Sequence, residues 1–288
     1  MKKNTFLFLF FLPFLLLGQE AISLSESRVF VYDKYKPLKN KPIKVWYYTP
    51  KKVKTDSPVL LVMHGNSRKA EAYRDALIPT AIEYGFILIV PEFSKTYYPK
   101  IRDYHHGGIF NDSKILKEEQ DWTFSIIEPL FNEIKSLWNN TSEGYFLYGF
   151  SAGAQFVHRY MYMKPQNRAR KIVAASAGTY TMPDFENDYS YGLKNVPLPA
   201  HSLKHFYNKD YTVCVGTADT VLARTDLAKS KKANQQGRDR VERAQKFFNL
   251  SRRKAKDLNL DFKWQYKEVT GVGHSQVDIA QHIGALFF

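Results

Sequence analysis

Hydrophobic positions along the chain alternate between short continuous runs and helical stripes. The continuous runs are bounded by glycine, proline or charged residues, and their length is typical of strands that are buried on both faces of a sheet. We expect strands at residues 28–35, 43–50, 57–65, 86–93, 144–150, 171–178, 211–216 and 261–269.

Between these runs, apolar residues recur at the spacing of amphipathic helices. We expect helices at residues 68–85, 117–140, 152–163, 235–257 and from about 277. Strands separated by helices predict a mainly parallel, eight-stranded sheet with helices on both faces. The predicted fold class is therefore α/β, with one domain over residues 19–288.

Two segments interrupt this alternation. Residues 94–116 form a polar and aromatic loop after the fourth predicted strand. Residues 179–210 are rich in proline and tyrosine and have no clear period, which predicts a lid-like insertion that crosses the surface. The shape of a pocket would depend on these two segments.

The N-terminus has the composition of an export signal. Two lysines near the start precede an apolar run over residues 5–17, and Gly18 offers a small residue for cleavage. We predict a signal peptide over residues 1–18 and a secreted or periplasmic protein with no membrane contact after cleavage. An uncleaved membrane anchor is the alternative.

Charge and cysteine content limit the function classes. The formal net charge of +14 favours anionic surfaces and substrates. The densest basic run, residues 250–257, has the spacing of a solvated helix face and no nucleic-acid motif accompanies it, so we expect no nucleic-acid partner. Cys214 is the only cysteine, which excludes an intramolecular disulfide and predicts a small buried side chain.

The pentapeptide Gly149-Phe150-Ser151-Ala152-Gly153 lies between a predicted strand and a predicted helix. A nucleophile elbow requires this order, because its serine occupies a tight turn where larger residues would crowd the strand and the helix. The context predicts that Ser151 is a catalytic nucleophile.

A serine nucleophile needs a base, and the base needs an acid that orients it. His274 follows the last predicted strand, and Asp219 follows the strand at 211–216. Both positions match the order of acid and then histidine that this architecture requires. Asp226 and Asp184 are alternative acids, and Gly271 and Gly273 flank the histidine loop with flexible backbone.

The third predicted strand ends in His64-Gly65-Asn66. Backbone N–H groups at this position and directly after the nucleophile form an oxyanion hole in such sites, so we predict Asn66 and Ala152 as its donors. We expect His64 to hold this loop through a hydrogen bond.

At this point the chain resembles a known family. The motifs HGN, GFSAG, GTADT and GVGHS resemble the α/β-hydrolase superfamily over residues 28–288. The stretches FSAGAQFVHRY, AGTYTMPD and QGRDRVERAQKFF are similar to the secreted poly(3-hydroxybutyrate) depolymerase and feruloyl esterase-like branch. The resemblance implies a serine carboxylester hydrolase that works through an acyl-enzyme without a metal or organic cofactor.

Other histidines and tyrosines offer further candidates. We predict His105 and His106, which follow the fourth strand, and Tyr180 as substrate contacts; solvation of the histidines and packing of the tyrosine against the protein are the alternatives. His201 and His205 have a metal-binding spacing but no third ligand, so we favour a polar surface. We also expect His158 to be a packed residue.

The predicted activity is hydrolysis of an aryl or acyl ester carried by a carbohydrate or polymer. A serine peptidase of the same fold is the alternative among enzymes. A non-catalytic exported binding protein is the alternative from another class.

Overall fold

The computed structural model describes residues 27–51, 53–198 and 200–287. The predicted signal peptide at residues 1–18 lies outside the described residues. Among the described residues, no helix has the length and apolar character needed to cross a membrane.

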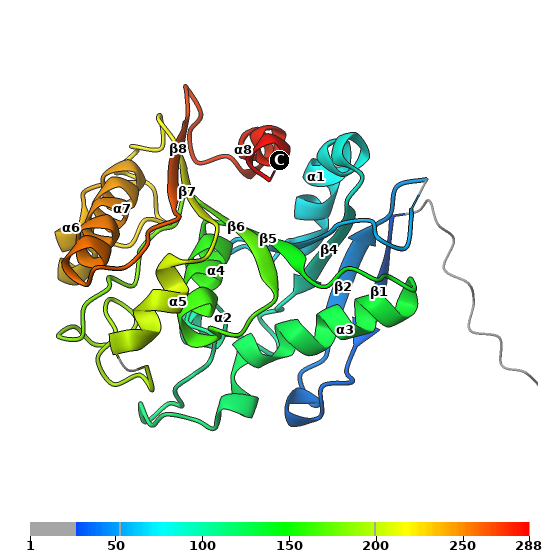
Figure 1. Cartoon of the computed structure of the whole chain (residues 1–288), viewed down its shortest axis with the longest axis horizontal. Coiled ribbons are helices and arrows are strands. Elements are labelled where there is room, and N and C mark those ends of the chain that lie inside the picture. Colours follow the sequence, from blue (N-terminus) through cyan, green and yellow to red (C-terminus); the bar gives the residue numbers. More distant parts are fainter. Residues whose placement is uncertain (1–26, 52, 199, 288) are drawn as a thin grey trace, which may run out of the picture.

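One sheet of eight strands passes through the molecule (Figure 1). Its order is β1-β2-β4-β3-β5-β6-β7-β8. The strands are β1 Ser27–Tyr32, β2 Ile43–Tyr48, β3 Val59–Met63, β4 Ile87–Glu92, β5 Tyr145–Phe150, β6 Ala169–Ala175, β7 Tyr211–Gly216 and β8 Gln265–Val269.

The direction of the strands explains where functional loops gather. β2 is antiparallel to both β1 and β4, whereas the strands from β4 across to β8 are parallel to their neighbours. The carboxyl ends of parallel strands meet at one edge of a sheet, where ligands bind in open α/β folds. The predicted fold class is confirmed.

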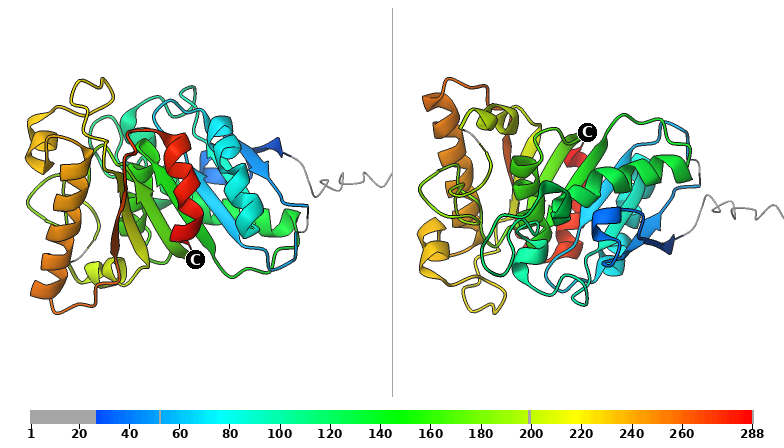
Figure 2. Two further views of the ribbon diagram at one scale, coloured as in Figure 1. Left: turned by 90° about the horizontal axis from the view of Figure 1, so that it is seen from above. Right: turned by 90° about the horizontal axis from the view of Figure 1, so that it is seen from below.

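Helices cover both faces of the sheet (Figures 1 and 2). α1 and α8 lie together on one face, and α3 and α4 lie on the other, with α5, α6 and α7 toward the β8 edge. The helices are α1 Ala70–Tyr84, α2 Ile101–Tyr104, α3 Ile127–Leu137, α4 Ala152–Met163, α5 Leu203–Tyr207, α6 Lys231–Gln236, α7 Arg240–Asp257 and α8 Gln276–Ile283.

A separate hydrophobic core fills each face. Leu77 of α1 and Ile279 of α8 pack over one face, while Leu130 of α3 and Phe247 of α7 belong to the core on the other. Every residue of β3 and of β7 is buried, as expected for strands that are covered on both faces. Cys214 is among them and is a free thiol.

The helix predicted at 117–140 is much shorter. Residues Glu119–Asp121 and Thr123–Ile126 form 3-10 turns, and the α-helix begins only at Ile127. Pro129 explains the late start, because a residue without an N–H fits only the first turn of a helix. The backbone N–H of Thr123 instead donates to the Gly107 carbonyl at 2.8 Å.

The helix predicted at 235–257 is two helices. Gly237 has a φ of 152° and separates α6 from α7. Asp239 then caps α7, because its carboxylate accepts from the Glu242 N–H at 2.9 Å. The break places Arg240 on the first turn of α7, where it is buried.

Other expected boundaries also move. β8 covers only the last part of the predicted strand 261–269. The predicted loop at 94–116 contains the short helix α2. In the segment 179–210, Tyr180, Leu193 and the apolar side of α5 join the core, while residues 186–188 are exposed.

Candidate active site

The turn between β5 and α4 presents Ser151. Its φ of 56° and ψ of −112° are uncommon for a residue with a side chain, as expected at a strained elbow. A Cβ on Gly149 would lie 2.3 Å from the Gly153 carbonyl oxygen, and one on Gly153 would lie 1.8 Å from the Met63 oxygen. Only glycine fits at either position, so the local sequence is what permits the turn.

His274 bridges the serine and an aspartate. Its Nε2 lies 3.0 Å from Ser151 Oγ, and its Nδ1 lies 2.7 Å from Asp219 Oδ2. The imidazole packs on the Phe150 ring with centroids 4.7 Å apart. The structure therefore brings together the three residues that the sequence predicted as nucleophile, base and acid.

The loop that carries His274 differs from the prediction in one detail. Gly271 has a φ of 75°, and its N–H donates to Thr217 Oγ1 at 2.8 Å. Gly273 has no such φ, and an added Cβ would meet only the Ala218 oxygen at 3.8 Å. Flexible backbone is therefore needed at Gly271 alone.

The three candidate acids have different surroundings. Asp184 accepts hydrogen bonds from backbone N–H groups of its own turn, at Glu186 and Asn187. Asp226 Oδ2 lies 3.8 Å from His274 Nε2, on the side of the ring that faces the serine. Asp219 is the one whose carboxylate contacts Nδ1, where an orienting acid belongs.

Arg240 joins two of these carboxylates. Its guanidinium is almost fully buried and lies 3.4 Å from Asp219 Oδ1 and 3.2 Å from Asp226 Oδ1. Arg224 binds Asp226 through a second fork, with distances of 2.9 and 2.8 Å. The hydrogen bonds from Arg224, with a further contribution from the Arg240 charge, hold the pKa of Asp226 well below its usual range.

Arg240 was not among the residues predicted from the sequence. Its signal was the stretch Gly237-Arg238-Asp239, since a glycine followed by a capping aspartate predicts that a new helix begins. A helix starting there places Arg240 at a fixed position near the loop after β7. The partner of its charge, however, lies 21 residues away.

The predicted oxyanion donors lie on two segments in close contact. Ala152 is the first residue of α4, and a backbone N–H at this position has no partner within its helix. The tight approach of Gly153 to Met63 presses this helix end against the end of β3, where Asn66 follows. The positive end of the helix dipole favours a negative oxygen there.

His64 holds the loop before Asn66. The Phe93 N–H donates to His64 Nε2 at 3.0 Å, which leaves the proton on Nδ1, 2.9 Å from the Gly65 oxygen. Burial lowers the pKa of His64 to about 3, so the ring is neutral near pH 7. The expected structural role of His64 agrees with these contacts.

The predicted substrate contacts have separate locations. Tyr180 departs from the prediction, because it is fully buried and stacks on Phe247 with centroids 4.4 Å apart. His105 is also buried, and its carbonyl accepts from Arg159. Only His106 faces a cavity, which is lined by none of the three residues Ser151, Asp219 and His274.

Three further histidines that the sequence singled out, His158, His201 and His205, lie in different surroundings. His158 is buried, with Nδ1 2.9 Å from the Ala154 oxygen and Nε2 accepting from the Thr181 N–H at 3.0 Å. His201 and His205 are exposed. Among the described residues, no three histidine, cysteine or acidic side chains form a group that would hold a metal ion.

Comparison with known proteins gives two close structural matches. Poly(aspartic acid) hydrolase-1 from Sphingomonas sp. KT-1 is 35% identical, with a TM-score of 0.88 over 91% of this chain and 98% of its own. LpqC, a poly(3-hydroxybutyrate) depolymerase from Bordetella parapertussis, is 29% identical, with a TM-score of 0.87 over 93% of this chain and 92% of its own.

More distant proteins share the fold. An S-formylglutathione hydrolase from Agrobacterium tumefaciens is 14% identical, with a TM-score of 0.57 over 90% of this chain and 92% of its own. No family model matches the sequence. No curated protein matches it either.

Proposed function

The chain belongs to the α/β-hydrolase superfamily, in the branch of the poly(3-hydroxybutyrate) depolymerase, and we propose that this hydrolase cleaves carboxylic esters through an acyl-enzyme. The observation that carries the proposal is the pair of contacts made by His274, 3.0 Å to Ser151 and 2.7 Å to Asp219. These distances lie within hydrogen-bond reach of a nucleophile, a base and an orienting acid.

The first half of the reaction forms the acyl-enzyme. Asp219 accepts a hydrogen bond from the Nδ1–H of His274, which keeps Nε2 unprotonated and ready to take the proton of Ser151 as Oγ attacks the ester carbonyl. The N–H groups of Asn66 and Ala152 stabilise the oxyanion, and such a donor contributes roughly 3 kcal/mol in comparable sites. His274 then protonates the leaving alcohol as the ester bond breaks.

The second half releases the acid. His274 Nε2 takes a proton from water, the resulting hydroxide attacks the acyl carbonyl, and Ser151 recovers its proton as it departs. Asp219 stabilises the imidazolium in both halves and remains ionised. Neither half requires a group beyond these side chains, the backbone donors and water.

The substrate we propose is an aryl or acyl ester borne by a carbohydrate or polymer. The likeness to a poly(3-hydroxybutyrate) depolymerase, at 29% identity over 93% of this chain, supports an ester polymer. The test is hydrolysis of p-nitrophenyl acetate, butyrate and octanoate and of methyl ferulate by the wild type, Ser151→Ala and the matched control Ser136→Ala.

We expect Ser151→Ala to lose up to ~10⁶-fold in kcat, on the scale of triad knockouts. Ser136 is an exposed residue of α3, so its variant should match the wild type. Equal activity of Ser151→Ala and the wild type would contradict the proposal and favour a non-catalytic binding protein.

A second candidate is cleavage of an amide-linked polyanion, which is the peptidase alternative in a specific form. The 35% identity to a poly(aspartic acid) hydrolase, covering 98% of that chain, favours it. The same triad cleaves amides, since only the leaving atom changes from oxygen to nitrogen. Release of new amino groups from poly(aspartic acid) by the wild type but not by Ser151→Ala would establish this activity.

We infer that the enzyme is exported to the periplasm or the medium. The lysines and apolar run of residues 1–18 support this inference. The intact mass of the protein recovered outside the cytoplasm should correspond to a chain beginning at Gln19. Recovery of the full chain in the membrane fraction would favour the uncleaved anchor instead.

A further inference from the structure

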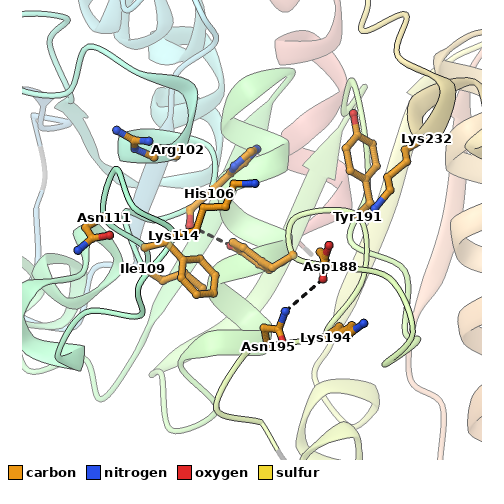
Figure 3. Close-up of a pocket in the computed structure, with 12 residues that line it drawn as sticks. Arg102, His106, Ile109, Asn111, Lys114, Asp188, Tyr191, Lys194, Asn195 and Lys232 are labelled. Carbon is orange, nitrogen blue, oxygen red and sulfur yellow. Dashed lines mark hydrogen bonds between the residues drawn. The ribbon is translucent and has the colours of Figure 1, made fainter.

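A cavity of about 450 Å³ lies among segments that follow β4, β6 and β7 (Figure 3). One wall comes from residues 102–114, after β4, and the facing wall comes from residues 188–195, after β6. Lys232, after β7, closes one side. All three segments follow carboxyl ends of parallel strands, as Ser151 and His274 do, and the volume is within the ~300–1,000 Å³ typical of ligand pockets.

The cavity is lined by an excess of positive charge. Arg102, Lys114, Lys194 and Lys232 contribute cations, and Asp188 contributes the one carboxylate among the lining residues. Asp188 accepts from Asn195 Nδ2 at 3.2 Å. Converging cations with low-dielectric walls attract anionic ligands.

The three lysines are available for a ligand. Arg102 is already paired with Asp112 and lies 3.8 Å from Asp103. Within the part of the chain that the structure describes, no ion pair involves Lys114, Lys194 or Lys232. These ammonium groups come from two loops and from helix α6, so they suit several separate anionic groups rather than a single ion.

The floor of the cavity is uncharged and partly apolar. Phe110 and Tyr189 are in contact with ring centroids 6.0 Å apart, and the Tyr189 hydroxyl donates to the His106 oxygen at 2.9 Å. His106 Nε2 lies 3.0 Å from Ser190 Oγ, and burial lowers the pKa of His106 well below its usual value. The floor therefore fits the uncharged backbone of a chain whose acidic groups reach the lysines.

Arg159 connects this floor to the nucleophile helix. It donates to the His105 oxygen at 3.1 Å and to the Ser190 oxygen at 3.3 Å. It lies eight residues after Ser151 on α4, which corresponds to about 12 Å along the helix.

We propose that this cavity is a second binding site, which holds the carboxylates of an acidic polymer while Ser151 acts farther along the same chain. The proposal rests on the proposed function and deepens it, since it assigns a polycarboxylate as the substrate class for either ester or amide cleavage. This site recognises the spacing of carboxylates along the polymer, so it does not distinguish an ester polymer from an amide polymer.

Binding can be measured without catalysis. The protein is full-length Ser151→Ala, and the probe is fluorescein-labelled deca(aspartic acid), followed by fluorescence anisotropy at 50 and 300 mM NaCl. The test variant replaces Lys114, Lys194 and Lys232 by glutamine. The control variant makes the same change of net charge at Lys39, Lys44 and Lys256, which are exposed and lie outside the cavity.

We expect the cavity variant to bind roughly tenfold more weakly at 50 mM NaCl, because each exposed ion pair contributes a small factor. The control variant should remain within about twofold, and added salt should reduce the difference between the two. Equal weakening in both variants would overturn the proposal, because net charge alone would then account for binding.

Two further probes test the chemical class. Deca(asparagine) with the same label keeps the backbone and removes the charge, so it should not bind. An equally long polyphosphate or single-stranded DNA should be affected equally by both triple variants. A loss confined to the cavity variant with those probes would contradict a site for carboxylates.

Because Ser151→Ala does not turn over, these outcomes are separate from those of the proposed function. Binding that depends on the cavity, without hydrolysis by the wild type, would leave this site intact and reject the enzyme. Hydrolysis by the wild type without cavity-dependent binding would support the enzyme and overturn the second binding site.

Discussion

Two of the loops that form the candidate active site are held by different forces. The elbow around Ser151 depends on the close approach of backbone, which only Gly149 and Gly153 permit. The acid loop after β7 depends on charge, because buried Arg240 contacts both Asp219 and Asp226. The first arrangement is encoded within five residues and the second is not, so only the first has a recognisable sequence motif.

Among changes to these two loops that leave the nucleophile in place, the largest effect should come from removing the acid's charge. We expect Asp219→Asn to lower kcat by ~10⁴-fold, because the amide favours the wrong tautomer of His274. Steady-state ester hydrolysis measures this. Asp184→Asn is the matched control, and its kcat should be unchanged. An equal loss of kcat in Asp226→Asn would instead indicate that Asp226 is the orienting acid.

The role of charge in holding the acid loop can be tested at Arg240. Arg240→Met leaves two carboxylates without their shared cation, and removal of one partner of a buried ion pair costs about 3–5 kcal/mol. We expect the low end in the free energy of unfolding, since Asp226 keeps Arg224. Urea unfolding gives this value.

Arg238→Met is the control for that experiment. Its side chain is exposed and pairs with Glu242 one turn along, a contact that contributes little to stability because water screens it. If both variants lost the same free energy of unfolding, the ion pairs of Arg240 would have no special role in holding the acid loop. A loss of kcat in Arg240→Met without a change in KM would indicate misplacement of Asp219.

The close backbone approach in the elbow around Ser151 can be tested at Gly153. Gly153→Ala places a methyl group against the Met63 carbonyl, and overpacking of this kind costs about 1–3 kcal/mol in the free energy of unfolding. Gly273→Ala, with open space around it, should stay within ~0.5 kcal/mol. Equal tolerance at both positions would mean that the elbow relaxes easily.

A smaller effect is expected in how the free energy of unfolding depends on pH, through His64. His64 has a folded-state pKa of about 3, below its unfolded value of ~6.5, so the unfolded chain binds its proton first. The stability that neutral His64 contributes is complete above pH 6.5 and is lost as the pH falls toward 3, at ~1.4 kcal/mol per pH unit.

His64→Asn should flatten the dependence of stability on pH across that window by about one proton. The exposed His282→Asn is the control and should leave the slope unchanged. Urea unfolding at pH 7, 5.5 and 4.5 gives the slopes. Identical slopes in the wild type and His64→Asn would show that His64 titrates normally in the folded state.

Sequence alone predicted much of the fold because buried parallel strands have a distinctive composition. The order of the strands placed Ser151, Asp219 and His274 at one edge of the sheet, and the structure has them within hydrogen-bond distance. Two helix boundaries were missed although Pro129 and Gly237 marked them. In each case a long amphipathic stripe outweighed one residue with special backbone behaviour.

Other features could not be predicted from local patterns. Arg240 meets Asp219 only after α7 packs beside β7, and the cavity joins three segments that have no periodicity. Tyr180 was expected at the pocket, yet its ring fills the core against Phe247. An aromatic residue in an irregular segment has the same signature in either place.

The central claim is that Ser151 is an activated nucleophile, and covalent labelling tests it most directly. The wild type should react with a fluorophosphonate probe, and peptide mapping by mass spectrometry should place a single adduct on Ser151. His274→Ala should label far more slowly, because the serine would lack its base. An adduct on another residue, or no adduct in a protein that still hydrolyses esters, would contradict the account.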